Sequence, residues 1–286
     1  MPAEERYATE KPREVGRLER AVEEPIRAGS LLWVFTDPHR GHELAYNRWY
    51  ERDHYYGGCM IGAYHFAGSR WVATASHKAA RPELGADMGF GRTDGSYACV
   101  YYYLDGHHDE ILDWSTPQVH ALYAEDRGFA PRTHYNTGTF RHRWRAYRDP
   151  QPVPVELALD HRYGGLVALF IDPTDDDTDR VDAFFESFLP GWLSGSPVAS
   201  VSTWDTIPLL DTKPDFVPGS PSNARQLQLH FVEGDPLDSW DRELALIDAL
   251  QESGAGTVAF AAPFIPTDVG TDRYVDDLWL DDGAQD

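Results

Sequence analysis

The feature that most constrains the fold is the order of predicted elements, which occurs twice along the chain with a period of about 135 residues. A short apolar strand, residues 31–35, is followed by an Asp-Pro pair at 37–38, and the strand 165–171 is followed by another at 172–173. After each pair come a helix, two strands, a helix and a strand. A proline-rich segment, residues 149–154, separates the two sets and has the composition of a domain boundary. The sequence therefore predicts two copies of one folding unit.

Apolar periodicity gives the elements of each copy. The first copy, residues 30–149, comprises strand 31–35, helix 43–56 ended by Gly57-Gly58, strand 61–74, strand 97–104, helix 109–125 and strand 134–147. The second copy, residues 164–275, comprises strand 165–171, helix 180–193, strand 198–206, strand 226–232, helix 239–252 and strand 257–264. The order β-α-β-β-α-β is ferredoxin-like. The predicted fold class is therefore α+β, with two tandem ferredoxin-like repeats.

The remaining segments flank or connect the two copies. Residues 1–29 form a polar N-terminal arm with a short helix expected over 17–24, and residues 150–163 form the linker. An acidic tail, residues 276–286, is expected to be loose. The loop 76–95 is long for a structureless connection, which is typical of a functional lid or a mobile segment.

The helices of a ferredoxin-like unit cover only one face of its sheet, so the other apolar face needs a partner. Two such sheets packed face to face within one chain form an eight-stranded, barrel-like core. The space between the sheets is then the expected small-molecule pocket. This arrangement predicts a monomer with a pseudo-dimeric core, or a weak homodimer.

Composition excludes several classes of function. The formal net charge of −22 argues against nucleic acid as a partner, because the phosphate backbone requires a basic surface. No apolar run approaches the ~18 residues of a membrane span, and no secretory signal is found, so a cytoplasmic protein with no membrane partner is expected. The two cysteines exclude a disulfide scaffold. The chain lacks phosphate-binding glycine motifs and a nucleophile elbow, which makes nucleotide cofactors and serine hydrolysis poor hypotheses.

A resemblance to a known superfamily rests on residues 46–55, Tyr-Asn-Arg-Trp-Tyr-Glu-Arg-Asp-His-Tyr, after a strand that ends in Asp-Pro. This run is similar to the aromatic helix of the dimeric α/β-barrel proteins, and more narrowly of their EthD-like branch. In that branch the His is often followed by Pro, whereas here Tyr55 follows His54. The matching stretch of the second copy, 184–192, has no histidine. The resemblance implies an intramolecular dimeric α/β-barrel with one working pocket on the first repeat.

Five residues are candidates for catalysis. His54 is the expected proton shuttle, and the others would orient it or the substrate: Asp53, His65, Tyr103 and His134. Candidate substrate-binding residues are Trp49, Tyr50, Tyr101, Asn136 and His230. The alternative interpretation is a polar helix end at positions 53–54, with aromatic core residues and a core histidine elsewhere.

The sequence predicts no metal site. The run 107–110, His-His-Asp-Glu, has no zinc spacing, and the acidic run 172–179 lacks the Gly and Glu of an EF-hand. The superfamily contains cofactor-free monooxygenases, polyketide cyclases, lactone isomerases, dehydratases, decarboxylases and heme proteins. The resulting hypothesis is a cofactor-independent enzyme of secondary metabolism, either a lyase-type cyclase or dehydratase, or a monooxygenase. The alternatives are a heme enzyme, with His54, His65, His134 or His230 as axial ligand, and a non-catalytic binding protein.

Overall fold

The computed structural model describes residues 26–209, 213, 218 and 224–280. The first half contains β1 (Ala28–Pro38), α2 (Glu43–Trp49), η1 (Tyr50–Met60), β2 (His65–Val72), α3 (Ala75–Ala79), β3 (Tyr97–Leu104), α4 (His108–Ala124) and β4 (Arg132–Tyr147). The second half contains η2 (Val155–Leu157), β5 (Gly165–Pro173), η3 (Thr174–Asp176), α5 (Thr178–Leu193), β6 (Val198–Ile207), β7 (Gln226–Val232), η4 (Pro236–Ser239), α6 (Trp240–Ser253) and β8 (Gly256–Pro266). The mixed α/β class is confirmed, and the predicted order holds except for the short helix α3 at the start of the predicted loop 76–95. The strand predicted over 61–74 is shorter than expected and begins at His65.

All eight strands form one closed antiparallel barrel in the order β1-β3-β2-β8-β5-β7-β6-β4. Each half contributes its strands in the sequence fourth, first, third, second, which is the ferredoxin-like order. The halves join edge to edge rather than face to face. One seam, between β4 and β6, is long and runs from Thr139↔Ile207 to Tyr147↔Ser200. The other seam, between β2 and β8, pairs only Trp71↔Pro266 and Val72↔Ile265.

The interior of the barrel is filled with aromatic side chains. Trp33 meets Phe170 at a ring-centroid distance of 5.9 Å and Phe264 at 6.1 Å, while Phe35 meets Phe260 at 5.6 Å. These side chains belong to one buried cluster drawn from both halves. Apolar packing therefore fills this part of the space between the two sheets, where the sequence predicted a ligand pocket.

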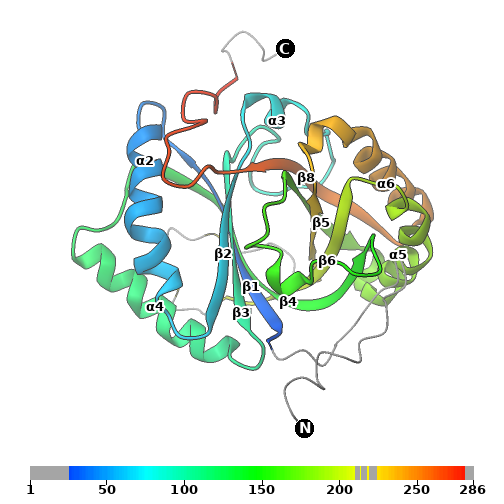
Figure 1. The fold of residues 1–286 in the computed structure, drawn as a ribbon, viewed down its shortest axis with the longest axis horizontal. Helices are drawn as coiled ribbons and strands as arrows, with labels where there is room; N and C mark the ends of the chain where they lie inside the picture. The colour runs from blue at the N-terminus through cyan, green and yellow to red at the C-terminus, as the bar shows by residue number, and fades with distance from the viewer. Residues whose placement is uncertain (1–25, 210–212, 214–217, 219–223, 281–286) are drawn as a thin grey trace.

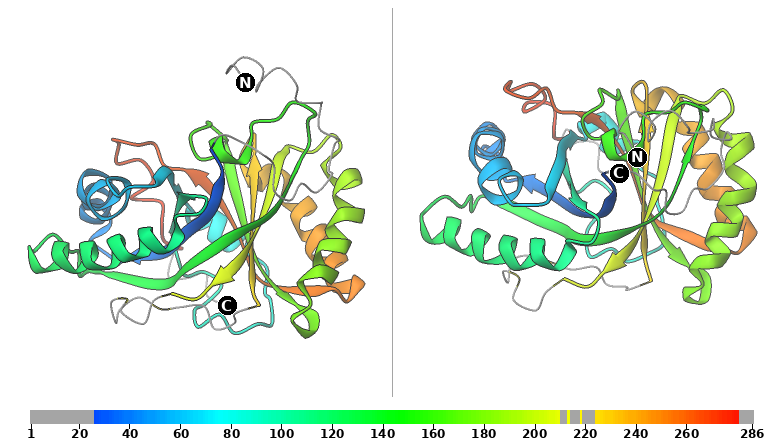
Figure 2. Two further views of the ribbon diagram at one scale, coloured as in Figure 1. Left: turned by 90° about the horizontal axis from the view of Figure 1, so that it is seen from below. Right: turned by 60° about the horizontal axis from the view of Figure 1, so that its bottom comes forward.

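The helices cover the barrel on two opposite sides (Figures 1 and 2). On one side α2, η1 and α4 pack on the outer face of the first-half strands, and on the other side α5 and α6 pack on the second-half strands. Successive side chains of a strand point to opposite faces. Tyr102 is accordingly part of the barrel interior, whereas its neighbours Tyr101 and Tyr103 face the first helix layer.

The first helix changes its winding part-way. The sequence predicts a helix that ends at Gly57-Gly58, but α2 continues without a break into η1, a π-helix that passes through both glycines to Met60. A π-helix is rare and joins residues five apart by its hydrogen bonds, so it places residues i and i+5 on one face. A Cβ at Gly58 would lie 2.8 Å from the His54 ring, so a larger residue here would displace that ring.

Residues 80–96 are anchored to the end of the barrel. Arg81 is buried and donates hydrogen bonds to the carbonyl oxygens of Arg92, Asp94 and Gly95. Met88 belongs to the interior cluster, and Phe90 packs against it. The loop therefore closes the barrel core, which differs from the lid or mobile segment that its length suggested.

The C-terminal segment returns to the first helix. Leu278 is fully buried, and the Trp279 indole Nε1 donates to the Glu43 carboxylate at 2.6 Å. The expectation of a loose tail is therefore wrong for residues 276–280. The helix expected over 17–24, most of the proline-rich loop 208–221 and the tail beyond residue 280 lie outside the described residues.

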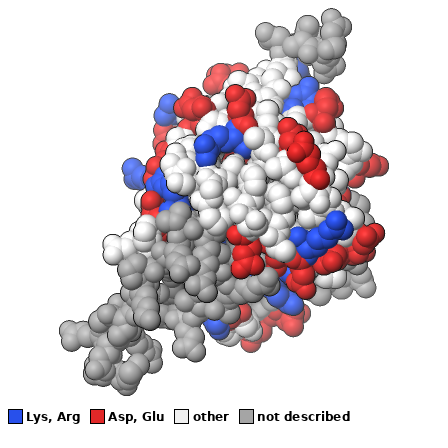
Figure 3. Space-filling view, turned by 90° about the vertical axis from the view of Figure 1, so that its right-hand side faces the viewer, with Lys and Arg blue, Asp and Glu red and all other residues white. Residues whose placement is uncertain are grey.

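Charged side chains lie on the surface of the molecule. On the face over α5 and α6, acidic and basic side chains surround a broad uncharged area (Figure 3). No helix in the described ranges is long and apolar enough to cross a membrane.

Candidate functional site

A cavity of about 110 Å³ lies between the first helix layer and the outer face of the first-half strands. We call it the histidine cavity. Its walls come from β1, η1, β2, β3, α4 and β4 and from the segment after β6. The lining residues are Leu32, Val34, Tyr50, His54, Gly58, Cys59, His65, Tyr103, Leu112, Ser115, Thr116, Val119, Arg132, His134, Thr137, Leu209 and Lys213. The cavity is thus built on the first half, although it is outside the barrel rather than inside it.

His54 is positioned by the winding of the π-helix. Its imidazole stacks on the Trp49 indole, five residues earlier, at 4.6 Å and an interplanar angle of 16°. The Tyr50 ring meets it edge-on at 5.2 Å. Within the described residues, His54 forms no hydrogen bond, so both of its ring nitrogens are available to a ligand.

Tyr103 and His65 come from adjacent strands. Their rings meet edge-on at 4.7 Å, and the Nδ1–H of His65 can donate to the Ala63 carbonyl oxygen at 3.4 Å. Tyr103 is fully buried, and its hydroxyl has no hydrogen-bond partner in the described part of the chain. A buried hydroxyl without a partner is costly, so its position on the cavity wall points to a ligand oxygen as its partner.

His134 and Arg132 separate the histidine cavity from a larger outer chamber. That chamber has a volume of about 410 Å³ and is lined by Tyr123, Phe129, Ala130, Arg132, Thr133 and His134. The Arg132 guanidinium lies over the Trp49 ring at 5.0 Å and donates to the Phe129 carbonyl and the Tyr123 hydroxyl. A ligand can therefore place one end in the inner cavity and its body in the chamber.

The histidines of the cavity are neutral at neutral pH. Burial, together with the charge of Arg132, lowers the pKa of His54 to about 3 and the pKa of His134 to about 3. Burial also lowers the pKa of His65 and raises the pKa of Tyr103 well above its usual value. The imidazoles and the phenol are therefore hydrogen-bonding groups that carry no charge.

The structure leaves five of the predicted site residues outside the cavity wall. Asp53 pairs with Arg127 on the outer side of the π-helix, and that contact lowers the pKa of its carboxyl. Tyr101 lies behind the wall and shares a hydrogen bond with the Tyr50 hydroxyl at 3.0 Å. Trp49 supports His54 from outside, and Asn136 is buried in β4.

His230 lies in the other half of the molecule. It is fully buried on β7 and bonds the Glu243 carboxylate of α6 at 2.9 Å and Gln228 Oε1 at 2.7 Å. These contacts use both ring nitrogens, so His230 is a core residue of the second half. Its position agrees with the alternative of a satisfied core histidine.

One wall of the cavity was missed from the sequence. It is a stripe of α4 that consists of Leu112, Ser115, Thr116 and Val119. The spacing i, i+3, i+4, i+7 is that of one helix face and could have located it. Ser115 and Thr116 interrupt the apolar pattern of this stripe, which explains why it was not predicted from the sequence.

No group of three or more His, Cys, Asp or Glu residues in the described ranges is arranged to hold a metal ion. Burial raises the pKa of the Cys59 thiol to about 12, which keeps this sulfur protonated and a poor nucleophile.

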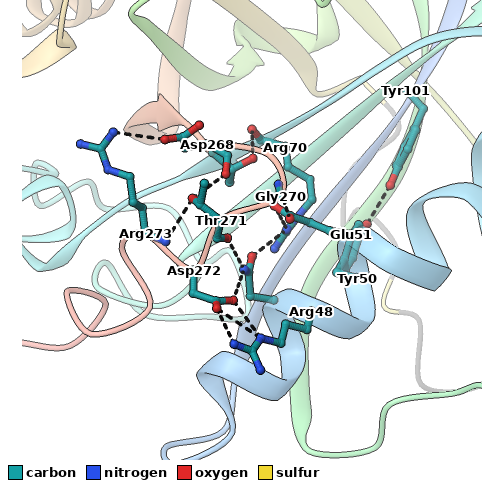
Figure 4. A network of polar contacts seen from close by, with 12 residues as sticks. Arg48, Tyr50, Glu51, Arg70, Tyr101, Asp268, Gly270, Thr271, Asp272 and Arg273 are labelled. Atoms are coloured by element: carbon teal, nitrogen blue, oxygen red, sulfur yellow. Dashed lines mark hydrogen bonds and ion pairs between the residues drawn. The ribbon is translucent and has the colours of Figure 1, made fainter.

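Contacts with the loop after β8 fix the helix that carries His54 (Figure 4). The Arg48 guanidinium forms an ion pair with Asp272 at 2.6 Å. The Glu51 carboxylate accepts the Gly270 N–H at 2.9 Å and pairs with the buried Arg70 at 3.1 Å. The second half therefore holds the first-half helix in place through these contacts.

Comparison with solved structures gives similarities at low sequence identity. An anthrone oxidase-like protein aligns with 89% of this chain and 98% of its own at 7% identity, with a TM-score of 0.49. A dye-decolorizing protein from V. cholerae aligns with 90% of this chain and 98% of its own at 9% identity, with a TM-score of 0.46. A chlorite dismutase variant from Candidatus Nitrospira defluvii aligns with 89% of this chain and 95% of its own at 10% identity, with a TM-score of 0.43. No protein-family model and no curated protein matches the sequence. The architecture therefore rests on the strand order itself.

Proposed function

We propose that the protein is a small-molecule enzyme that acts in the histidine cavity without a bound cofactor. Its substrate is an aromatic, polyketide-like or otherwise enolisable compound. The observation that supports this most is the convergence of neutral imidazoles and an unpartnered buried hydroxyl on one cavity, which are the side chains His54, His65, His134 and Tyr103. Such convergent polar groups in a mostly apolar pocket are typical of substrate sites.

The histidine cavity and the outer chamber suggest where the two parts of the substrate lie. A cavity of about 150 Å³ holds a benzene ring, so 110 Å³ suits a small reacting group. The outer chamber, with the Tyr123 and Phe129 rings in its wall, suits the remaining aromatic body. The substrate would pass between Arg132 and His134, whose side chains border both spaces.

The reaction we propose is proton removal next to a carbonyl or phenol oxygen. Tyr103 stays protonated and donates a hydrogen bond to the oxygen as negative charge develops on it. The neutral imidazoles of His54 and His134 act as further donors, because a low pKa suits them for polarising an oxygen rather than for taking a proton. The proton acceptor is His65, since donation from its Nδ1–H to Ala63 leaves Nε2 free.

Heme is the alternative cofactor, and its fit can be judged from the cavity. The neutral histidines are suitable axial ligands. However, the 110 Å³ cavity is far smaller than the roughly 300–1,000 Å³ of usual ligand pockets, so a macrocycle beside His54 does not fit this conformation. We therefore propose no step through heme.

Several finer features belong to the same proposal. The reaction is a cyclisation, a dehydration or a cofactor-free oxygenation. The two halves are copies of one ancestral unit and take the place of the two subunits of a dimer, which makes the protein a monomer. We expect it in the cytoplasm. Light scattering during size-exclusion chromatography would test the oligomeric state.

A pair of matched variants tests the site. The full-length protein is incubated with hydroxylated aromatics and β-dicarbonyl compounds, and turnover is followed by O2 consumption and mass spectrometry. Tyr103→Phe should lower kcat/KM by about 100-fold, because it removes one donor to the developing oxyanion. Tyr102→Phe is the control, since this adjacent hydroxyl is also buried and unpartnered in the described chain but belongs to the barrel interior.

The outcomes separate the alternatives. Equal effects of the two substitutions would contradict the assignment of Tyr103. Saturable binding of these compounds with no chemical change would indicate a binding protein instead of an enzyme. A Soret band that appears with added heme and disappears in His54→Ala would favour the heme alternative.

A further inference from the structure

The two seams of the barrel differ, and the short one leaves a cleft. Strands β2 and β8 pair at Val72↔Ile265 and Trp71↔Pro266. Beyond these two positions, the N–H and the hydroxyl of Thr267 donate hydrogen bonds to the Arg70 carbonyl oxygen. The chain then turns away towards Arg48 and Glu51 of the first helix, as Figure 4 shows. The edge of β2 before Arg70 therefore has no neighbouring strand on this side.

We call the resulting space the seam cleft, defined by Ser69, Leu159, Asp160, Thr267 and Val269. Its larger part has a volume of about 530 Å³ and its smaller part about 270 Å³, and both parts share these five residues. The larger volume is within the range of small-molecule sites. The seam cleft is distinct from the histidine cavity, with which it has no lining residue in common.

Two polar side chains in the cleft lack a partner within the described part of the chain. Trp71 is 1% exposed, and its indole Nε1–H makes no hydrogen bond. The Asp160 carboxylate forms no ion pair, and burial without a compensating cation raises its pKa. The exposed Arg162 side chain lines the same space. The cleft thus offers donors and an acceptor together.

The charges around the cleft balance. Asp160 and Asp268 face it with Arg162 and Arg273, and Arg273 pairs with Asp268 at 3.2 Å. A cationic ligand would meet two guanidinium groups, and an anionic ligand would meet two carboxylates. Either ligand charge would lie beside like charges as well as opposite ones, which favours a neutral ligand.

We infer that the seam cleft binds a neutral polyhydroxylated ligand, of the chemical class of a saccharide or cyclitol. A hydroxyl group both donates and accepts, so one ligand can satisfy the Asp160 carboxylate and the Trp71 N–H. The aromatic ring of Tyr274 in the wall provides a face for the C–H side of such a ring. This inference is independent of the reaction proposed for the histidine cavity.

Calorimetric titration of the full-length protein tests it, with maltose and myo-inositol as neutral probes. Glucosamine and glucuronate serve as the charged counterparts. We expect saturable binding of at least one neutral probe and weaker binding of both charged sugars. Trp71→Phe keeps an aromatic ring and removes the N–H, so affinity should fall about tenfold. Asp160→Ala should weaken binding by a similar factor.

The matched control is Trp33→Phe. Trp33 is also fully buried with an unpartnered Nε1 within the described residues, but it does not line the cleft. Its substitution should leave binding unchanged, and circular dichroism checks that all variants are folded. The inference is overturned if no neutral probe binds saturably, if a charged sugar binds as tightly, or if Trp71→Phe and Trp33→Phe behave alike. Tyr103→Phe should bind the sugar as the wild type does, which separates this test from that of the proposed function.

Discussion

The two helix layers of the molecule pack against sheets of the same strand order but fill the space differently. In the second half, α5 and α6 place Phe185, Leu189 and Leu246 against the strands, and all three are fully buried. In the first half, the π-helix and α4 meet the strands with tyrosines, histidines and glycines. Rings stacked on a widened helix cannot interdigitate as aliphatic side chains do, and the histidine cavity remains.

Equivalent strand positions make the difference concrete. Leu32 pairs with Tyr101 in the first half, and Val167 pairs with His230 in the second. Both polar side chains face their helix layers. His230 is closed off by two hydrogen bonds and the Trp192 ring, whereas Tyr101 bonds Tyr50 on the wall of a cavity. The comparison teaches that the second half stabilises the barrel while the first half leaves room for a ligand.

The largest expected effect concerns core truncation in the two layers. Leu189→Ala should lower the free energy of unfolding by about 4 kcal/mol, because it opens a new cavity in a filled layer. Leu112→Ala, on the cavity wall, should cost about 2 kcal/mol, since that side chain already borders empty space. Urea denaturation measures both. Equal losses would show that the layers are equally well packed.

The next effect concerns the polar group buried in the second half. Glu243→Leu removes the acceptor of His230 and should cost about 2 kcal/mol, because a buried ring nitrogen loses its partner. Glu243→Gln retains an acceptor oxygen and serves as the control, with a smaller loss in the same denaturation experiment. If the two variants are equally destabilised, packing of α6 rather than the hydrogen bond holds this site.

A further difference between the two halves is their response to acid. His54, His134 and His142 have a pKa of about 3 in the folded protein against about 6.5 when unfolded. The unfolded state therefore binds more protons between these values. Stability is complete above about pH 6.5 and falls as the pH drops towards 3, by up to about 1.4 kcal/mol per pH unit for one proton.

All three of these histidines belong to the first half, so acid should act there first. Hydrogen exchange followed from pH 7 to pH 5 should accelerate in η1 and β4 before it does in α5 and α6. His54→Gln should reduce the slope of unfolding free energy against pH by about one proton. A slope unchanged by this substitution would mean that the ring is solvated, which would weaken the picture of a dry cavity.

Local patterns in the sequence were sufficient for much of the fold. Strand 97–104 was predicted within its observed bounds, and the Asp-Pro pairs correctly marked the ends of β1 and β5. The role of the aspartate in each Asp-Pro pair became clear only from the tertiary structure. The Asp37 carboxylate accepts the N–H groups of Gly95 and Ser96 before β3, and Asp172 pairs with Arg225 before β7.

The candidate site was predicted in part. The sequence named the histidines and Tyr103, and the structure brings them to one cavity. It also named Asp53, which faces the opposite side of the helix, and His230, which lies in the other half. Residue type indicates which chemistry is possible at a position, whereas its neighbours depend on packing between distant segments.

Short-range periodicity and composition were enough to predict the elements, their repeated order and the residue types available for chemistry. Tertiary structure alone decided that the pocket lies outside the barrel, since the aromatic rings of both halves fill the interior. It also decided that the first helix unwinds into a π-helix and stacks His54 on Trp49. The seam cleft has the same origin, because the extent of pairing between β2 and β8 depends on where the chain after β8 is anchored.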